Sequence, residues 1–377
     1  MSRRDEDGQH GPEPDRVEGC PHPAETESLF GQDAAVAAFH QAWTSGRLHH
    51  AWLITGAQGV GKATLAYRLA RALLTHETAP ARFDMDPDCP VTGRIRAGSE
   101  TRLIVLRRGL DRPGRADARL RTVIAAEEAR GLNRALSFRV PDGGRRVVIV
   151  DSIDECNTQA ANALLKNVEE PPARTHFLML SHRPAGLLPT IRSRCRKLAL
   201  APLGPADLGA ALGALGSRVD DGALAGLAAL AGGSVAAAWK LVDAEGLALY
   251  ATLCGLIAPH GDGADLRRVI ALADTVGGRD RVERFRLVLD LGVTLIVRLA
   301  RAAAEETAPP PAVPAEATLL DAAARAGPPH ARRLAAAAAA MAAEGQKARD
   351  ANLDPARTVI DTWARLGPRS SGEAPAA

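Results

Sequence analysis

A glycine-rich loop is the first place where this 377-residue sequence has the residues for chemistry. Residues 50–55 are predicted to form a short buried strand and residues 65–74 an amphipathic helix. The loop between them contains Gly56, Gly59, Gly61, Lys62, Ala63 and Thr64. Glycines let backbone N–H groups close around an anion, the helix start adds a positive dipole, and the lysine reaches the outer phosphates. The spacing predicts a phosphate-binding loop. The alternative interpretation is a glycine-rich turn that arose by chance.

The position after the lysine departs from this pattern. A working loop has Ser or Thr there, and its hydroxyl coordinates Mg²⁺. This sequence has Ala63 instead. Thr64 is a poor replacement, because one residue further along a helix the side chain is rotated by about 100°. We therefore expect the metal site to be damaged, which leaves the binding of ATP open.

Two further predicted strands end in polar residues. Residues 147–150 are a continuous apolar run that ends in Asp151, and residues 177–180 form a second run that ends in Ser181. Between them, residues 157–170 carry apolar side chains at helical spacing and stop at two prolines. A strand, a helix and a strand of this length predict a right-handed crossover in a parallel sheet, with Asp151 as the second element of the phosphate site.

Charged residues at the end of this region break local rules. Glu169 and Glu170 lie in the last turn of the predicted helix, where negative charge opposes the helix dipole by about 0.3–1 kcal/mol. Arg192, Arg194 and Arg196 alternate, so in an extended segment at the sheet's edge all three would face one side. Such charges are typical of functional surfaces. A solvated helix end and a solvated strand edge explain them equally well.

Three motifs in this order resemble the ATPase core of the bacterial clamp-loader subunits of DNA polymerase III, which are AAA+ proteins. They are Asn162-Ala-Leu-Leu-Lys166, Glu169-Glu-Pro-Pro172 and Ser193-Arg-Cys195. The resemblance covers roughly residues 29–366 and is strongest up to residue 200. It implies an α/β fold with a P-loop parallel-sheet core at 28–201, a three-helix lid at 202–244 and an all-α oligomerisation collar at 245–367. Residues 1–27 and 368–377 are expected to be disordered tails.

The resemblance also assigns roles. In hydrolysing relatives a glutamate follows the aspartate of the central strand and an arginine of the lid points at the phosphates, where this chain has Ser152 and Ala236. The polar residue at Ser181 is the expected sensor of the terminal phosphate. With the hydrolytic groups missing and the Ser-Arg-Cys motif intact, we expect no ATPase activity of its own, and Arg194 as an arginine finger in a neighbouring ATP site. An active motor ATPase of the same family is the alternative.

The resemblance further implies a hetero-oligomer with the clamp-loader motor subunits and the delta subunit, which opens the sliding clamp and loads it on primed DNA. Related subunits often carry a four-cysteine zinc module near residues 78–100. This chain has only Cys89 there, and its five cysteines contain no CxxC pair, so we expect no zinc.

Composition adds few constraints on function. The net charge of +3 is too mild to indicate a nucleic-acid binder. Residues 107–121 contain six arginines, which could contact phosphates, although a solvated loop is the favoured reading and a DNA-binding protein acting alone the least favoured. No apolar signal segment or membrane span is evident, so we expect a cytoplasmic protein without a membrane partner.

Overall fold

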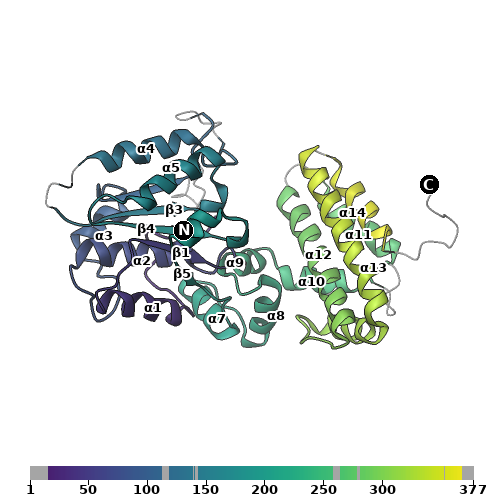
Figure 1. Ribbon diagram of the computed structural model, residues 1–377. Coiled ribbons are helices and arrows are strands. Elements are labelled where there is room, and N and C mark those ends of the chain that lie inside the picture. Colours follow the sequence, from purple (N-terminus) through teal and green to yellow (C-terminus); the bar gives the residue numbers. More distant parts are fainter. Residues whose placement is uncertain are drawn as a thin grey trace, which may run out of the picture. The chain divides into compact units, whose positions relative to one another are not determined.

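The computed structural model describes residues 16–112, 119–138, 140, 143–257, 264–277, 281–351 and 353–366. Their internal contacts divide the chain into two units. One comprises the residues up to Arg218 together with Gly233–Ala236, and the other comprises Val219–Gly232 and the residues from Ala237 onward. The first unit contains a parallel sheet and the second is helical (Figure 1).

The sheet has five parallel strands in the order β2-β3-β4-β1-β5. They are β1 (Ala51–Thr55), β2 (Leu103–Arg107), β3 (Arg146–Asp151), β4 (Thr175–Ser181) and β5 (Arg196–Ala199). The apolar run from Val147 to Val150 is fully buried, as expected of a central strand covered on both faces. The predicted α/β class and the parallel crossover are confirmed.

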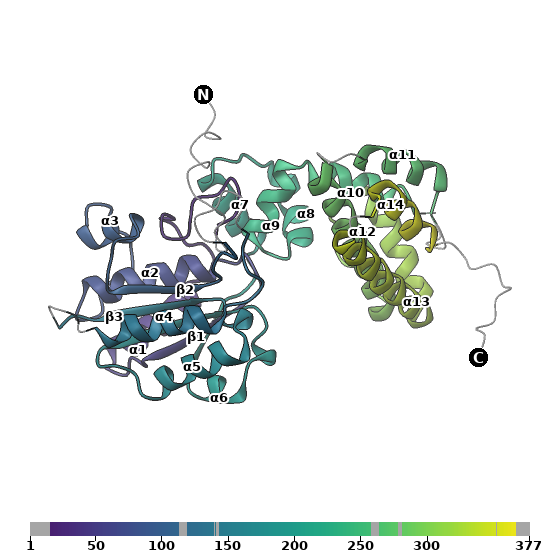
Figure 2. The same cartoon turned by 90° about the horizontal axis from the view of Figure 1, so that it is seen from above.

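Helices cover both faces of the sheet (Figure 2). On one face lie α1 (Asp33–Thr44) and α2 (Lys62–Thr75), and the ring of Phe39 in α1 is 4.8 Å from that of Trp52 in β1. On the other face α4 (Ala126–Ser137) and α5 (Thr158–Glu169) contribute Leu132 and Leu164 to a core shared with alternate strand residues. Asn157 caps α5, because its side chain accepts a hydrogen bond from the Ala160 N–H at 2.8 Å.

Two short helices also belong to this unit. Before β2 lies the short helix α3 (Pro90–Arg96), and one prediction for the segment before β5 was wrong. The arginines of the Ser-Arg-Cys region do not alternate along a strand, because α6 (Pro189–Ser193) occupies that segment. Pro189 at the first position of α6 favours this helical turn.

Part of the amino-terminal segment that we expected to be disordered packs against α2. The Arg71 guanidinium donates to the Ala24 carbonyl at 2.8 Å and to the Thr26 carbonyl at 3.3 Å, and Ala24 is buried. Burial lowers the pKa of Arg71 to about 10. Residues 1–15 of the predicted tail at 1–27, and the whole predicted tail at 368–377, lie outside the described residues.

The three predicted lid helices are α7 (Pro205–Ala214), α8 (Asp221–Ala231) and α9 (Val235–Asp243). The contacts do not set them apart as a unit of their own, because α7 belongs to the sheet unit and α8 to the helical unit. Within the described residues no single helix is long and apolar enough to cross a membrane. The helices α8 and α9 reach the required length and hydropathy only when they are counted together, and they are bent relative to each other.

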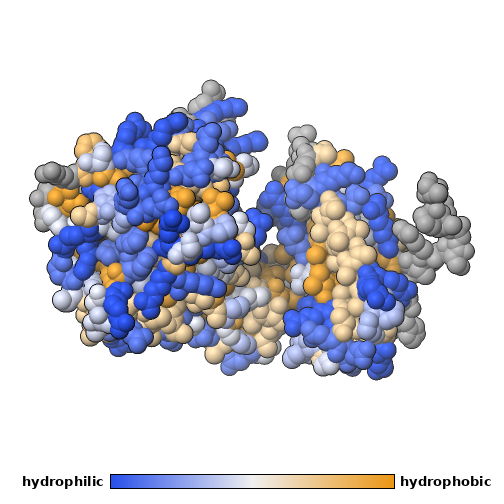
Figure 3. Space-filling model, viewed as in Figure 1, coloured by the Kyte–Doolittle hydropathy of each residue, from blue (hydrophilic) through white to orange (hydrophobic). Residues whose placement is uncertain are grey.

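The helical unit also contains α10 (Gly246–Cys254), α11 (Leu266–Val276), α12 (Val282–Glu305), α13 (Ala317–Asp350) and α14 (Pro355–Ala364). The helices α12 and α13 lie side by side (Figure 1), and α13 is kinked at Gly327, before two prolines. Asp354 caps α14, accepting from the N–H groups of Ala356 and Arg357. Alanine-rich segments leave pale apolar areas on the visible face of this unit, between hydrophilic residues (Figure 3).

The buried carboxylate of Glu316 stabilises the loop between α12 and α13 through several hydrogen bonds. Glu316 is fully buried and accepts hydrogen bonds from the Tyr250 hydroxyl at 2.8 Å, from Arg298 Nε at 2.6 Å and from the Ala312 N–H at 2.6 Å. Burial, followed by the charge of Glu316, raises the pKa of Tyr250. Removal of this carboxylate would deprive the buried Tyr250 hydroxyl and the largely buried Arg298 guanidinium of this acceptor.

We expect Glu316→Ala to lower the free energy of unfolding by about 3–5 kcal/mol, because it leaves the Arg298 charge uncompensated. Urea unfolding followed by circular dichroism measures this change. Glu305→Ala is the matched control, because Glu305 pairs with Arg301 at 2.7 Å on the surface. Loss of such an exposed pair changes stability by about 1 kcal/mol or less. Equal effects of the two substitutions would contradict the assigned role of Glu316.

Candidate functional site

The carboxyl edge of the sheet brings the predicted phosphate-site residues together. Thr55, the last residue of β1, is in register with Ser181, the last residue of β4, and the Gly56 N–H donates to the Ser181 carbonyl at 3.3 Å. Asp151 ends the neighbouring strand β3. The glycine-rich loop leads directly into α2, which begins at Lys62. The arrangement is therefore the predicted strand, loop and helix.

The lysine of the loop is turned onto the loop itself. Lys62 is 4% exposed, and its Nζ donates to the carbonyls of Gly56 at 2.9 Å and Ala57 at 2.6 Å. Burial lowers the pKa of Lys62 to about 8, while the negative charges of Asp151 and Asp154 act in the opposite direction. A phosphate at this position would have to replace the two carbonyls as the partner of the ammonium group.

The sequence did not indicate that Asp154 belongs to the site. The short 3₁₀ turn Ile153–Glu155 follows β3 and brings Asp154 to the end of β4. There one carboxylate oxygen accepts from the Ser181 hydroxyl at 2.9 Å and the other accepts from the His182 N–H. The expected phosphate sensor is thus engaged by a carboxylate of its own chain. The only sequence signal was an acidic residue three positions after a strand end, which is common in turns.

The start of α9 packs on the glycine-rich loop. The Val235 N–H donates to the Gly59 carbonyl at 3.0 Å. Gly59 has a φ of +77°, and a Cβ atom there would lie 2.1 Å from Ser234 Oγ and 2.9 Å from Ala236 Cβ. Glycine is therefore required both by the backbone conformation and by the space. Ala236, where the resemblance expects an arginine, lies against the loop without a charge to offer.

The position at which the catalytic carboxylate is expected is buried and carries a serine. Ser152 is 1% exposed, and its hydroxyl has no hydrogen-bond partner among the described residues. A serine there cannot act as the carboxylate that orients an attacking water. Ala63, in the first turn of α2, likewise offers no oxygen to a metal ion.

Arg194 lies on the outside of the sheet unit, directly after α6. Its Nη2 forms an ion pair with Glu169 Oε1 at 2.9 Å, and its Nη1 donates to the Thr190 carbonyl at 3.1 Å. The Arg194 side chain is 40% exposed, whereas the neighbouring Cys195 packs against the core and burial raises its thiol pKa to about 12. The motif therefore anchors its cysteine and exposes its arginine.

The arginine-rich segment at 107–121 is partly neutralised by its own domain. Arg108 pairs with Glu155 at 2.9 Å, and Arg121 pairs with Glu127 at 3.2 Å and Glu128 at 3.0 Å. Residues 113–118 lie outside the described residues. These ion pairs hold Arg108 and Arg121 against their own unit, and the solvated loop stays a prediction.

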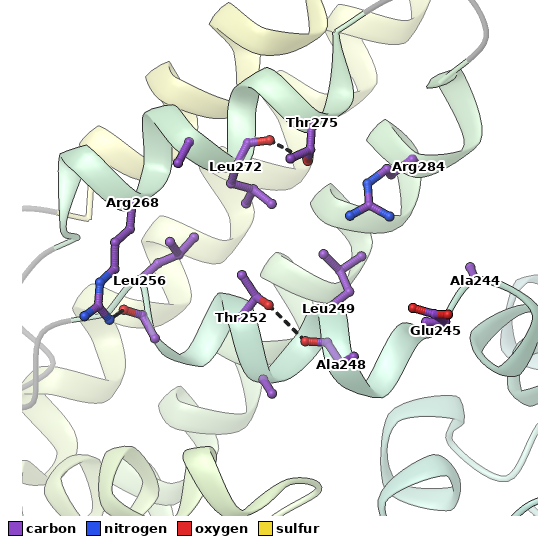
Figure 4. A pocket seen from close by; sticks show the side chains of 13 residues that line it. Ala244, Glu245, Ala248, Leu249, Thr252, Leu256, Arg268, Leu272, Thr275 and Arg284 are labelled. Atoms are coloured by element: carbon purple, nitrogen blue, oxygen red, sulfur yellow. Dashed lines mark hydrogen bonds between the residues drawn. The ribbon is translucent and has the colours of Figure 1, made fainter.

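A cleft of about 590 Å³ lies between α10 and α11 in the helical unit (Figure 4). Leu249, Leu256 and Leu272 line it, and Arg268 is held beside it by a 2.8 Å hydrogen bond to the Gly255 carbonyl. None of the predicted site residues lines this cleft. It is a feature separate from the phosphate loop.

Comparison with known proteins agrees with the motifs. The family model described as "DNA polymerase III, delta subunit" matches residues 31–204. The DNA polymerase III subunit delta' of Pseudomonas aeruginosa is 36% identical over 195 residues, which are 51% of this chain and 55% of that protein. Residues 31–204 are thus similar to the DNA polymerase III delta subunit family. The resemblance to clamp-loader subunits is confirmed for this region.

Other relatives extend the comparison. Subunit tau of DNA polymerase III from Escherichia coli is 31% identical over 175 residues, which are 46% of this chain and 25% of that protein. A solved DNA polymerase III gamma subunit-related protein from Thermotoga maritima matches with 18% identity and a TM-score of 0.34, over 89% of this chain and 98% of that one. The chain spans about half the length of its delta' relative and a quarter of tau.

The buried ammonium group predicts a specific pH dependence of stability. The folded-state pKa of Lys62, about 8, lies below the ordinary lysine pKa of 10.5, so the unfolded chain binds more protons between these values. The wild type should therefore gain up to about 3 kcal/mol of stability relative to Lys62→Met between pH 7 and pH 10.5. Urea unfolding of both proteins across this range measures the difference. The exposed Lys197→Met is the control, and a gap that does not change with pH would contradict the burial of a charged Lys62.

Proposed function

We propose that this chain is a non-hydrolysing clamp-loader subunit that supplies Arg194 to the ATP site of a neighbouring motor subunit. The observation that carries the proposal is an asymmetry between two sites of the same unit. Arg194 is exposed beside its motif partners, while Lys62 of the phosphate loop is buried against carbonyls of its own loop. The Arg194 side chain can thus reach another molecule, whereas the Lys62 ammonium group already has hydrogen-bond partners within its own loop.

Three groups needed for hydrolysis are missing from the chain's own site. Ala63 cannot ligate Mg²⁺, Ser152 cannot orient the attacking water, and Ala236 brings no positive charge to the phosphates. Phosphoryl transfer depends on positioning and on charge stabilisation, so each loss alone lowers the rate by orders of magnitude. The loop retains its glycines and Lys62, and ATP remains a candidate ligand of it without being a substrate.

Arg194 has the chemistry that a neighbouring active site needs. A guanidinium is always charged and presents several N–H donors in a rigid plane, which matches the oxygens of a phosphoryl group. Directed at the terminal phosphate of ATP, it would neutralise the charge that develops during transfer. In other phosphoryl-transfer proteins such fingers contribute on the order of 10³–10⁵ in rate.

The proposed partners follow from the family. They are the motor subunits and the delta subunit in a hetero-oligomer, which acts on the sliding clamp and primed DNA. The helical unit formed by α10 to α14 is the proposed oligomerisation collar. The similarity of residues 31–204 to the delta subunit family supports the proposed partners.

Arg194→Ala should strongly lower ATP turnover and clamp loading by a complex reconstituted with this chain, because the finger charge is lost. Assembly should remain intact, since the side chain lies on the surface. Steady-state hydrolysis and size-exclusion chromatography measure the two properties. Arg192→Ala is the matched control, because Arg192 is an exposed arginine of α6, two residues before Arg194. Unchanged turnover in the Arg194 variant would rule out the finger.

The alternative, an active motor ATPase, is favoured by the retained Lys62 and Asp151 and by the similarity to subunit tau. The purified chain with ATP and Mg²⁺ separates the two functions. We expect phosphate release at the level of a Lys62→Ala control, because the metal ligand and the catalytic carboxylate are absent. Rapid release that requires Lys62 would favour the motor ATPase and refute the proposal.

A further inference from the structure

The carboxylate that binds Arg194 occupies an unfavourable place. Glu169 is the last residue of α5, where the helix dipole disfavours negative charge. Its only ion pair in the described chain is with Arg194, at 2.9 Å, and the second anchor of that guanidinium is the Thr190 carbonyl at 3.1 Å. The pair therefore gives a physical reason for a carboxylate at this helix end.

The exposure of the pair decides how firmly it holds. The side chains of Glu169 and Arg194 are 39% and 40% exposed, so water screens the attraction between them. Exposed pairs of this kind bias an equilibrium by about 1.4- to 5-fold, that is about 0.2–1 kcal/mol. The contact orients the guanidinium most of the time and yet opens readily.

We propose that Glu169 is the resting partner of Arg194 and competes with the phosphate of the neighbouring ATP for the same guanidinium. A carboxylate and a phosphate both accept the planar donors of an arginine, and Nη2 cannot serve both in the same geometry. The finger is therefore available only in the fraction of molecules in which the pair is open, and its apparent strength is reduced by that fraction. Glu169 is a positioning residue that acts through Arg194, and this inference rests on the proposed finger function.

The test uses the complete reconstituted complex with clamp and primed DNA, and single-turnover ATP hydrolysis as its readout. Glu169→Gln keeps the size of the side chain and removes its charge. It should raise the rate by about 2- to 5-fold at low salt, because the competitor of the phosphate is weakened. The increase should shrink towards 1 at about 0.5 M salt, where exposed pairs are screened, and should be absent in an Arg194→Ala background.

Glu170→Gln is the matched control, because Glu170 is the neighbouring exposed carboxylate and has no contact with Arg194 among the described residues. Thermal melting of each variant verifies that it is folded. A rate for Glu169→Gln equal to that of Glu170→Gln, or below that of the wild type, would overturn the inference. If Arg194→Ala lowers the rate while Glu169→Gln does not change it, only the resting partner is wrong. If Arg194→Ala has no effect, the finger itself is refuted.

Discussion

The carboxyl edge of the parallel sheet is the constraint on which the sheet unit depends. Buried parallel strands deliver their last residues to one edge, and here that edge collects Lys62, Asp151, Asp154 and Ser181. Charges gathered in this way need partners. Here two carbonyls of the glycine-rich loop accept hydrogen bonds from Lys62, and the Asp154 carboxylate accepts one from Ser181. The polar groups of this edge are therefore hydrogen-bonded within the chain itself.

These internal hydrogen bonds explain how a lysine can be buried at this edge of a stable fold. A buried ammonium group without acceptors would cost several kcal/mol, but the two carbonyls satisfy Lys62 and two carboxylates lie near it. Gly59 must also remain, since the start of α9 fills the space in which a side chain would lie. Packing alone therefore accounts for the glycine at position 59.

Most of the sheet unit could be predicted from the sequence, because continuous apolar runs and glycine-rich turns are local signals. The strands ending at Thr55, Asp151 and Ser181 were found in this way, as were the helices that follow Lys62 and Asn157. The short helices α3 and α6 were missed, since seven and five residues are too few to show a period. The role of Asp154 depends on a contact across 27 residues, between the turn after β3 and the end of β4. No local pattern reports such a contact.

Two arginine–glutamate pairs of this chain differ in what their surroundings allow. Arg298 and Glu316 lie at 2.6 Å with the carboxylate fully buried and bonded to two further donors, so neither charge can leave without a large penalty. Arg194 and Glu169 lie at a similar distance of 2.9 Å, but both side chains reach solvent. Water can replace either partner there, so the pair orients Arg194 but leaves it able to bind another group. The two distances alone would suggest pairs of equal strength. Because the Arg298–Glu316 pair is buried it is a fixed part of the fold, whereas the exposed Arg194–Glu169 pair can open and bind other partners. A side chain that must reach another subunit has to belong to the second kind.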